Sequence, residues 1–191
     1  MQSATLLMGL SMLLSCDRIP WLPGHGRSQG PDRQSEVVDV DCSTREGRPP
    51  REDCVSKRLA CSDTVKSTTA GGTSVYSDDF YRGKYCLPSF GGYDGPERVY
   101  LLDLPPQTEA EIYLDGQCAD LDLFAFRWGF DGACPGTAHP ISECEADAGN
   151  KGTGHVHVET VTRAATYFIV VDGKGSVTAP FAVTVECRPR P

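Results

Sequence analysis

The sequence predicts an all-β fold, an antiparallel β-sandwich of about eight strands that follows an export signal and a flexible tether. Short runs of alternating apolar and polar residues recur from residue 61 onward, which is typical of half-buried antiparallel strands. The 20 Gly and 14 Pro residues of the 191-residue chain separate these runs as turn residues do. The chain shows no convincing amphipathic helix, so a coiled coil or helical bundle is not expected.

The clearest strands are three segments in which every second residue is small or apolar. They lie at residues 109–114, 155–159 and 181–186. In the first, Ala110, Ile112 and Leu114 share one face, because side chains alternate across a strand. Shorter or more uniformly apolar runs predict further strands at residues 64–69, 73–76, 98–104, 121–127 and 166–171.

The N-terminus predicts export. Residues 1–15 carry no charged side chain, and the apolar stretch at 4–14 has the length of a signal-peptide core rather than of a membrane span. The stretch ends in Leu13-Leu14-Ser15-Cys16, which resembles a bacterial lipobox. That resemblance implies cleavage before Cys16 and its modification with lipid, including a fatty acid such as palmitate, which would anchor the protein to the outer membrane. The alternative is an ordinary signal peptide and a secreted protein.

The cysteines predict a disulfide framework. Without Cys16, an even number remains, which in an exported chain indicates paired cysteines. They are Cys42, Cys54, Cys61, Cys86, Cys118, Cys134, Cys144 and Cys187. Closure of short loops predicts the pairs Cys134–Cys144 and Cys42–Cys54, while the full connectivity stays open.

Composition divides the chain into a tether at 16–60 and a folded domain at 61–187, with a short tail at 188–191. The tether is rich in Pro and Gly, and Trp21 is its only aromatic residue, so it is expected to be flexible. Residues 17–60 hold 8 basic and 8 acidic side chains. The net charge of −8 therefore lies in residues 61–191, with 10 basic and 18 acidic side chains, which argues against a nucleic-acid partner.

Four segments precede a last strand, in the order 67–73 with 78–81, 96–104, 119–124 and 164–173. In this order they resemble the bacterial pre-peptidase C-terminal (PPC) domain family, in particular the cysteine-rich lipoproteins of myxobacteria and their relatives. The resemblance implies a non-catalytic, jelly-roll-like sandwich. It also implies a binding or adhesion module for a polysaccharide or protein on the cell envelope. The alternative is a structural or accessory envelope lipoprotein that assists an exported partner such as a secreted protease.

Two aspartates near the start of a predicted strand indicate a candidate Ca²⁺ site. Asp120 and Asp122 point to the same face, and Asp172 lies in an Asp-Gly turn. Asp94 or Glu97 could complete the oxygen ligands that Ca²⁺ needs. The spacing of an EF-hand is absent, and the alternative is that these carboxylates accept hydrogen bonds from loop amides.

A second metal hypothesis concerns His155, His157 and Glu159, which share one face of a predicted strand. Imidazoles at this spacing can hold Zn²⁺ when further ligands converge on them. The ordinary alternative is a polar, solvent-facing side of a sheet.

Aromatic residues in the predicted loops suggest a recognition surface. Trp128 and Phe130 follow a strand, and Tyr93 lies between glycines. Exposed aromatic rings of this kind can stack on sugars or on a protein partner. The alternative is that the rings pack beneath their own loops.

No sequence motif indicates catalysis. The chain lacks Gly-x-Ser-x-Gly, His-Glu-x-x-His and a glycine-rich phosphate-binding fingerprint, which are patterns that carry nucleophilic, zinc and nucleotide chemistry. The protein is therefore expected not to be an enzyme and to need no cofactor, apart from the candidate Ca²⁺.

Overall fold

The structure is a computed structural model. It describes residues 33, 36–44, 46–50, 54–84, 91–128, 134, 136, 141–148 and 152–190. The chain divides into two units, Met1–Gln34 and Ser35–Pro191, and the strands and helices described below lie in the second. The predicted signal peptide, the lipobox and Cys16 lie outside the described residues. Within the described part, no helix has both the length and the apolar character needed to cross a bilayer.

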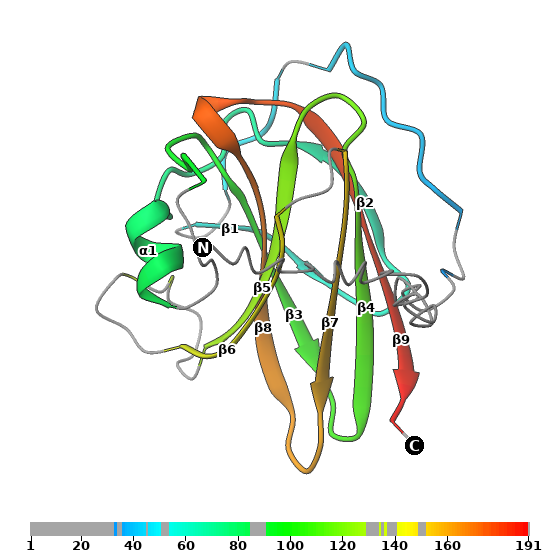
Figure 1. Cartoon of the computed structure of the whole chain (residues 1–191). Helices are drawn as coiled ribbons and strands as arrows, with labels where there is room; N and C mark the ends of the chain where they lie inside the picture. The colour runs from blue at the N-terminus through cyan, green and yellow to red at the C-terminus, as the bar shows by residue number, and fades with distance from the viewer. Residues whose placement is uncertain are drawn as a thin grey trace, which may run out of the picture. The chain divides into compact units, whose positions relative to one another are not determined.

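The fold is an all-β sandwich of two sheets, as predicted (Figure 1). One sheet has five strands in the order β1-β3-β8-β5-β6, and the other has four in the order β2-β9-β4-β7. The elements are β1 (Val55–Leu59), β2 (Thr64–Thr68), α1 (Asp78–Gly83), β3 (Arg98–Leu104), β4 (Thr108–Asp115), β5 (Leu121–Trp128), β6 (Ile141–Asp147), β7 (Thr153–Thr160), β8 (Ala165–Gly173), the 3₁₀ turn η1 (Lys174–Ser176) and β9 (Pro180–Pro189).

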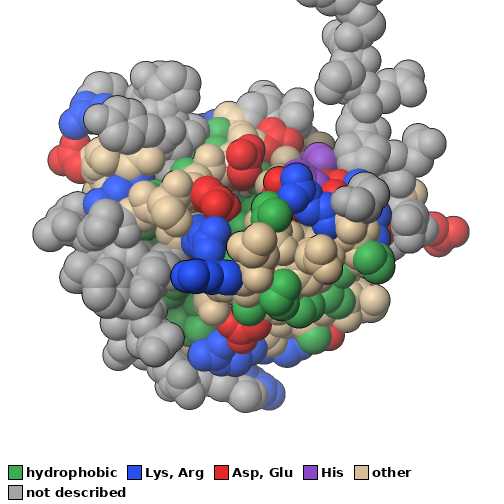
Figure 2. Space-filling view, turned by 90° about the horizontal axis from the view of Figure 1, so that it is seen from below, with side chains coloured by type: hydrophobic (Ala, Val, Ile, Leu, Met, Phe, Trp, Pro, Cys, Tyr) green, Lys and Arg blue, Asp and Glu red, His purple; other side chains and the backbone are tan. Residues whose placement is uncertain are grey.

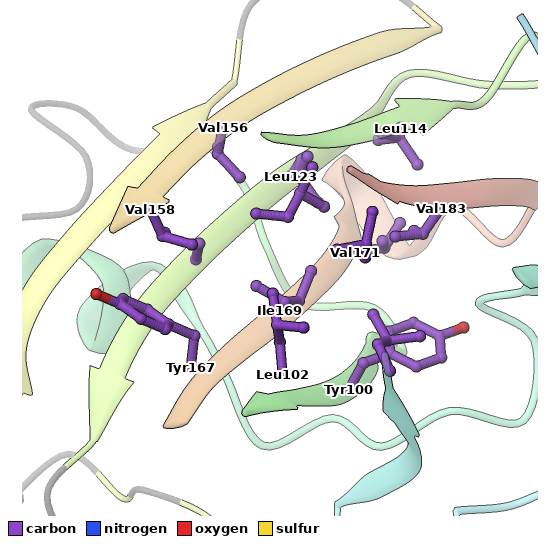
Figure 3. Packing of buried hydrophobic residues seen from close by; sticks show 14 of the residues in the cluster. Tyr100, Leu102, Leu114, Leu123, Val156, Val158, Tyr167, Ile169, Val171 and Val183 are labelled. Atoms are coloured by element: carbon purple, nitrogen blue, oxygen red, sulfur yellow. The ribbon is translucent and has the colours of Figure 1, made fainter. Parts of the chain in front are cut away.

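The main core lies between the two sheets. The faces predicted for β4, β7 and β9 are the buried ones, and their apolar residues pack against β3, β5 and β8 of the opposite sheet. Figure 3 shows this packing, with Val156, Val158 and Val183 from the four-stranded sheet and Leu123 and Ile169 from the five-stranded sheet. Alternation along a strand thus identifies the inner face correctly, because side chains of a half-buried strand point in turn to core and solvent.

A second core covers the outer face of the five-stranded sheet. Phe124, Phe126 and Phe168 point away from the main core and pack against Phe80 and neighbouring rings brought by α1 and its flanking segments. The Phe126 and Phe168 rings stack with centroids 5.6 Å apart. Both faces of β5 and β8 are therefore buried, which explains why these strands are almost uniformly apolar rather than alternating.

The strand assignment differs from the prediction in three places. Residues 73–76 form no strand, and only Thr73 makes an isolated bridge, to Glu97. Two strands, β1 and β6, were not predicted, because their sequences alternate poorly and contain charged residues. One pair, β1 with β3, is parallel, whereas all the other strand pairs are antiparallel. Helix α1 was also missed, since six residues are too few for a helical pattern.

The predicted domain boundary at residue 61 is too late. Strand β1 precedes it and pairs with β3. Farther upstream, the Val38 amide donates to Asp115 at 3.0 Å, and Lys66 donates to the Asp39 carbonyl at 2.7 Å. The described part of 36–60 is therefore attached to the sandwich rather than a free spacer, because backbone pairing and side-chain hydrogen bonds fix it.

Three disulfides are formed among the described cysteines: Cys42–Cys118, Cys54–Cys134 and Cys61–Cys187. The two pairs predicted from short loops, Cys42–Cys54 and Cys134–Cys144, are wrong. The observed bonds span 76, 80 and 126 residues, because strands distant in the sequence become neighbours in the sheets. Cys144 is disulfide-bonded as well, and Cys86 lies outside the described residues. Such bonds persist in oxidising compartments and indicate an extracytoplasmic protein.

Candidate functional site

The main core reaches solvent at two opposite sides of the sandwich, where the edge strands of the two sheets do not pair. One side lies between β1 and β2, and the other between β6 and β7. Each side has a tyrosine from the five-stranded sheet. Figure 3 shows that the hydroxyls of Tyr100 and Tyr167 point in opposite directions from the packed side chains. Tyr100 lines a cavity on the first side and Tyr167 lines one on the second.

The cavity on the β1–β2 side, called the edge cavity below, has a volume of about 530 Å³. Its apolar lining includes Val40, Val65, Tyr100, Pro180 and Phe181. Its polar lining includes both signs of charge, from Lys57, Lys66, Asp41 and Glu46. A mostly apolar cavity of a few hundred Å³ with a few polar groups is typical of small-ligand sites.

Two buried hydroxyls of residues that line the edge cavity make no well-formed hydrogen bond to the described part of the chain. Ser56 Oγ and Tyr100 Oη are shielded and have no partner of good geometry, although Ser67 lies beside Tyr100. Most buried polar groups in proteins are hydrogen-bonded, and a buried group that is not costs about 1–3 kcal/mol. A ligand that offers hydrogen-bonding groups to these two hydroxyls would recover that free energy.

Burial raises the pKa of Tyr100 to about 12, although the Ser67 hydroxyl and the charge of Arg98 act in the opposite direction. The phenol therefore stays protonated at physiological pH. It can both donate and accept a hydrogen bond, which suits a hydroxylated ligand.

One wall of the edge cavity comes from the segment 40–49, which was predicted to be tether. The Cys42–Cys118 disulfide attaches this segment to the turn after β4. Arg98, which is almost fully buried, attaches it at the other end by donating to the carbonyl of Arg48. The same guanidinium donates to the carbonyls of Thr68 and Ala70. The hydrogen bonds of Arg98 thus hold this wall of the cavity in place. The wall consists of residues that composition alone assigned to a flexible spacer.

The aspartates predicted to bind Ca²⁺ are brought partly together. Asp122 and Asp172 are register partners on β5 and β8 and are buried beneath α1. Asp172 accepts hydrogen bonds from Tyr81 Oη at 2.8 Å and from the Gly173 amide at 2.7 Å. Burial raises the pKa of Asp172 to about 8, against the effect of the Tyr81 hydrogen bond, and the charges of Glu97 and Asp122 raise it further.

The side chain of Lys174 lies at the position that a Ca²⁺ ion bound by Asp120 and Asp122 would occupy. The Lys174 ammonium is 3.0 Å from Asp122 Oδ2 and 4.0 Å from Asp120 Oδ2. Of the two further predicted ligands, Asp94 is exposed, and buried Glu97 accepts hydrogen bonds from Thr73 and from the Val75 amide. Most of these carboxylate oxygens accept hydrogen bonds from protein donors, as in the hydrogen-bonded alternative, while Asp122 Oδ1 and Glu97 Oε2 are buried with no hydrogen-bond partner among the described residues.

The predicted aromatic surface is not formed by Tyr93. Its side chain is fully buried, packs against Tyr81 and Phe124, and donates a hydrogen bond to Asp122. Trp128 is the last residue of β5, and Phe130 lies outside the described residues. The Asp78 carboxylate explains the burial of Tyr93, because it accepts hydrogen bonds from the amides of Gly91, Gly92 and Tyr93 and ties this loop to α1.

The histidine face predicted for β7 is formed as expected. His155, His157 and Glu159 lie on the side of the strand away from the main core, where the four-stranded sheet faces solvent. The sequence did not indicate that Glu109 and Glu111 of β4 lie opposite them, because that depends on the β4–β7 register. The Tyr113 ring stacks on His155 with centroids 4.8 Å apart.

Comparisons with known proteins leave the family open. No protein-family model matches the chain, and no curated protein matches it. Among solved structures, it is similar to the pre-peptidase C-terminal domain of a collagenase from Bacillus anthracis, with a TM-score of 0.40 and 11% identity over 74% of this chain and 100% of that one. It is also similar to PliG of Aeromonas hydrophila, a periplasmic inhibitor of g-type lysozyme, with a TM-score of 0.38 and 17% identity over 69% and 98% of the two chains. Similarities of this size establish neither a family nor a function.

Proposed function

We propose that the protein is a non-catalytic binding module of the bacterial cell envelope that takes a segment of polysaccharide into the edge cavity. The observation that supports this most is the pair of buried hydroxyls, Ser56 Oγ and Tyr100 Oη, which belong to residues of the cavity lining and make no well-formed hydrogen bond among the described residues. Polar groups that are held in an apolar cavity and not used by the fold are available to fix the orientation of a ligand.

The chemistry of the lining favours a saccharide. A sugar ring has apolar faces and many hydroxyls that both donate and accept hydrogen bonds. The edge cavity provides apolar contacts through Val65 and Pro180, donors through Lys57 and Lys66, and acceptors through Asp41 and Glu46. The presence of both donors and acceptors suits an uncharged polyol better than a purely anionic or purely apolar ligand.

The proposal includes a lipid anchor at Cys16, based on the lipobox-like Leu13-Leu14-Ser15-Cys16. Lipid on this cysteine would attach the module to the outer membrane, since several acyl chains together give stable binding. Labelling with radioactive palmitate, compared between the natural chain and Cys16→Ala, tests the anchor. Loss of label in the variant is expected, whereas equal labelling would point to an ordinary secreted protein.

Binding is tested by a glycan array and a pulldown with cell-wall polysaccharide, followed by affinity measurements with the best glycan. Tyr100→Phe removes one hydroxyl and keeps the ring, and we expect affinity to fall about five- to tenfold, the effect of one hydrogen bond. Tyr167→Phe is the matched control, because its hydroxyl lies at the opposite side, within hydrogen-bond distance of Glu143 Oε2 and of the Glu159 carbonyl.

Three outcomes would contradict the proposed function. One is the absence of any bound glycan, and another is an equal loss of affinity in the two tyrosine variants. The third is recovery of a secreted protease or another exported protein from envelope extracts in place of glycan. This last result, with a deletion strain that has normal adhesion and an altered exoprotein profile, would favour the accessory-lipoprotein alternative.

A further inference from the structure

The solvent-facing side of the four-stranded sheet carries a compact group of histidine and glutamate side chains. Figure 2 shows one end of the sandwich, where a histidine (purple) lies beside basic and acidic side chains at the upper right. Glu109, His157 and Glu159 each offer a ligand atom, and these three atoms lie within 4.8 Å of one another. We propose that these three residues bind a divalent transition-metal ion, with Glu111 orienting His157 from behind.

Strand register brings these residues together. Strand β4 pairs with β7 so that Glu109 is opposite Glu159 and Glu111 is opposite His157. The two side chains on each strand point to the same face because they lie two positions apart. The register makes that face common to both strands. A site built on two paired strands has a rigid backbone, so only small rotamer changes are needed to bring the three ligand atoms around one ion.

The nearly buried Glu111 contacts both histidines of β7. Its side chain is only 5% exposed and has close contacts with both histidines: His157 Nδ1 at 3.0 Å and His155 Nε2 at 2.6 Å. A carboxylate that accepts a hydrogen bond from Nδ1 places the proton there and leaves the Nε2 lone pair of His157 free to bind a metal. Metal-binding histidines nearly always have such a carboxylate or carbonyl partner.

The site is accessible to solvent. The side chains of His157 and Glu159 are each 40% exposed. Both also line the cavity on the β6–β7 side, which has a volume of about 570 Å³ and contains Glu143 and Tyr167. Three protein ligands beside an open space leave a coordination position for water or another small ligand.

Two arginines compete with the ion. Arg188 contacts Glu109 Oε1 and its Nη2 lies 3.2 Å from Glu111 Oε1, and Arg190 Nε lies 2.8 Å from Glu159 Oε2. Arg188 is exposed near the end of β9, and Arg190, which follows this strand, is partly exposed. An ion must displace them or use the other oxygen of each carboxylate, so removal of an arginine should strengthen metal binding rather than weaken it.

The ligand atoms of the site favour Zn²⁺ or a similar transition-metal ion over Ca²⁺. One imidazole nitrogen and two carboxylates suit Zn²⁺ and neighbouring transition metals, whereas Ca²⁺ takes six or more oxygen ligands. This ion would be held far from the Asp120–Asp122 pair and independently of any glycan in the edge cavity.

Calorimetric titration of the full chain with ZnCl₂ tests the proposal, using protein purified without a histidine tag and treated with a chelator beforehand. We expect saturable binding of one ion below about 1 mM, weakened at least about tenfold by His157→Gln. The matched control is His155→Gln, since His155 also contacts Glu111 but is not one of the three ligands. The His155→Gln variant should bind Zn²⁺ with an affinity within about threefold of that of the natural protein.

A third variant distinguishes a metal-binding site from a cluster that forms only ion pairs. Arg188→Gln should increase Zn²⁺ affinity by releasing Glu109, and circular dichroism should show that all variants are folded. The proposal is overturned if the natural protein binds no Zn²⁺ up to about 1 mM. It is also overturned if the two histidine variants lose affinity equally, or if Arg188→Gln weakens binding.

Discussion

Asp122 on β5 and Asp172 on β8 are directly opposite each other on the covered face of the five-stranded sheet, and each accepts a hydrogen bond from a different buried tyrosine. Tyr93 donates to the first and Tyr81 to the second, and both rings stand in the layer that covers the sheet. The cover therefore supplies both apolar surface and the hydrogen-bond donors that two buried carboxyls require.

We predict that this pair makes stability depend on pH through Asp172. Its pKa is raised to about 8 in the folded protein, mainly by burial. Between its ordinary value of 3.8 and about 8, the native state binds a proton that the unfolded state has released. The free energy of unfolding should thus fall as pH rises through this window, by at most about 1.4 kcal/mol per pH unit.

Asp172→Asn removes this titration, because it replaces the carboxyl group with an amide of the same shape. Urea unfolding at several pH values should show the variant gaining stability relative to the natural protein from pH 4 to pH 8. A constant difference between the two proteins over that range would show that Asp172 is ionised throughout.

Lys174 is predicted to stabilise the same cluster. Its ammonium faces Asp122 Oδ2, and Asp122 Oδ1 is buried with no hydrogen-bond partner in the described part of the chain. Lys174→Met should lower the free energy of unfolding by about 1–2 kcal/mol, a modest loss because the lysine is about a third exposed. Because the ammonium lies at the candidate cation position, we also expect no heat on titrating the natural protein with millimolar Ca²⁺. A clear Ca²⁺ isotherm would restore the calcium hypothesis.

The sequence predicted what depends on local periodicity and missed what depends on register. The inner faces of β4, β7 and β9 followed from alternation, and so did the common face of His155 and His157. The positions of Glu109 and Glu111 opposite those histidines could not be read from one strand alone. The disulfide partners were missed for the same reason, because the chemistry of a cysteine does not indicate which distant strand becomes its neighbour.

Composition was misleading at 36–60. Pro, Gly and balanced charge are typical of a spacer, but a disulfide and a buried arginine can hold such a segment with little apolar burial. The wall of the edge cavity arises in this way, through Cys42–Cys118 and Arg98. Tyr93, which lies among glycines, was likewise assigned to the surface because no local pattern shows that Asp78 ties its loop to α1.

We predict that Cys42–Cys118 contributes to both stability and binding. Replacing both cysteines with serine should lower the free energy of unfolding by about 2–4 kcal/mol, as for other disulfides, and should weaken glycan binding because the segment 40–49 is released. The control is Cys61→Ser with Cys187→Ser. That pair should lower stability similarly but leave glycan affinity unchanged, since neither cysteine lines the edge cavity. Unchanged glycan affinity in the Cys42 and Cys118 variant would show that the cavity wall formed by the segment 40–49 does not contribute to glycan binding.

The last prediction concerns the second core. Phe80 of α1 is 1% exposed and packs on Tyr76 and Phe126, with ring centroids 4.5 Å and 5.7 Å away. Phe80→Ala removes a large side chain from a closely packed aromatic cluster and should lower the free energy of unfolding by about 3–5 kcal/mol. Val75→Ala is the control on the same covering segment, because Val75 is 46% exposed and should cost no more than about 0.5 kcal/mol. Chemical denaturation followed by tryptophan fluorescence and circular dichroism measures both. If Phe80→Ala cost no more than Val75→Ala, α1 would be a surface attachment, and the outer face of the five-stranded sheet would not be a core.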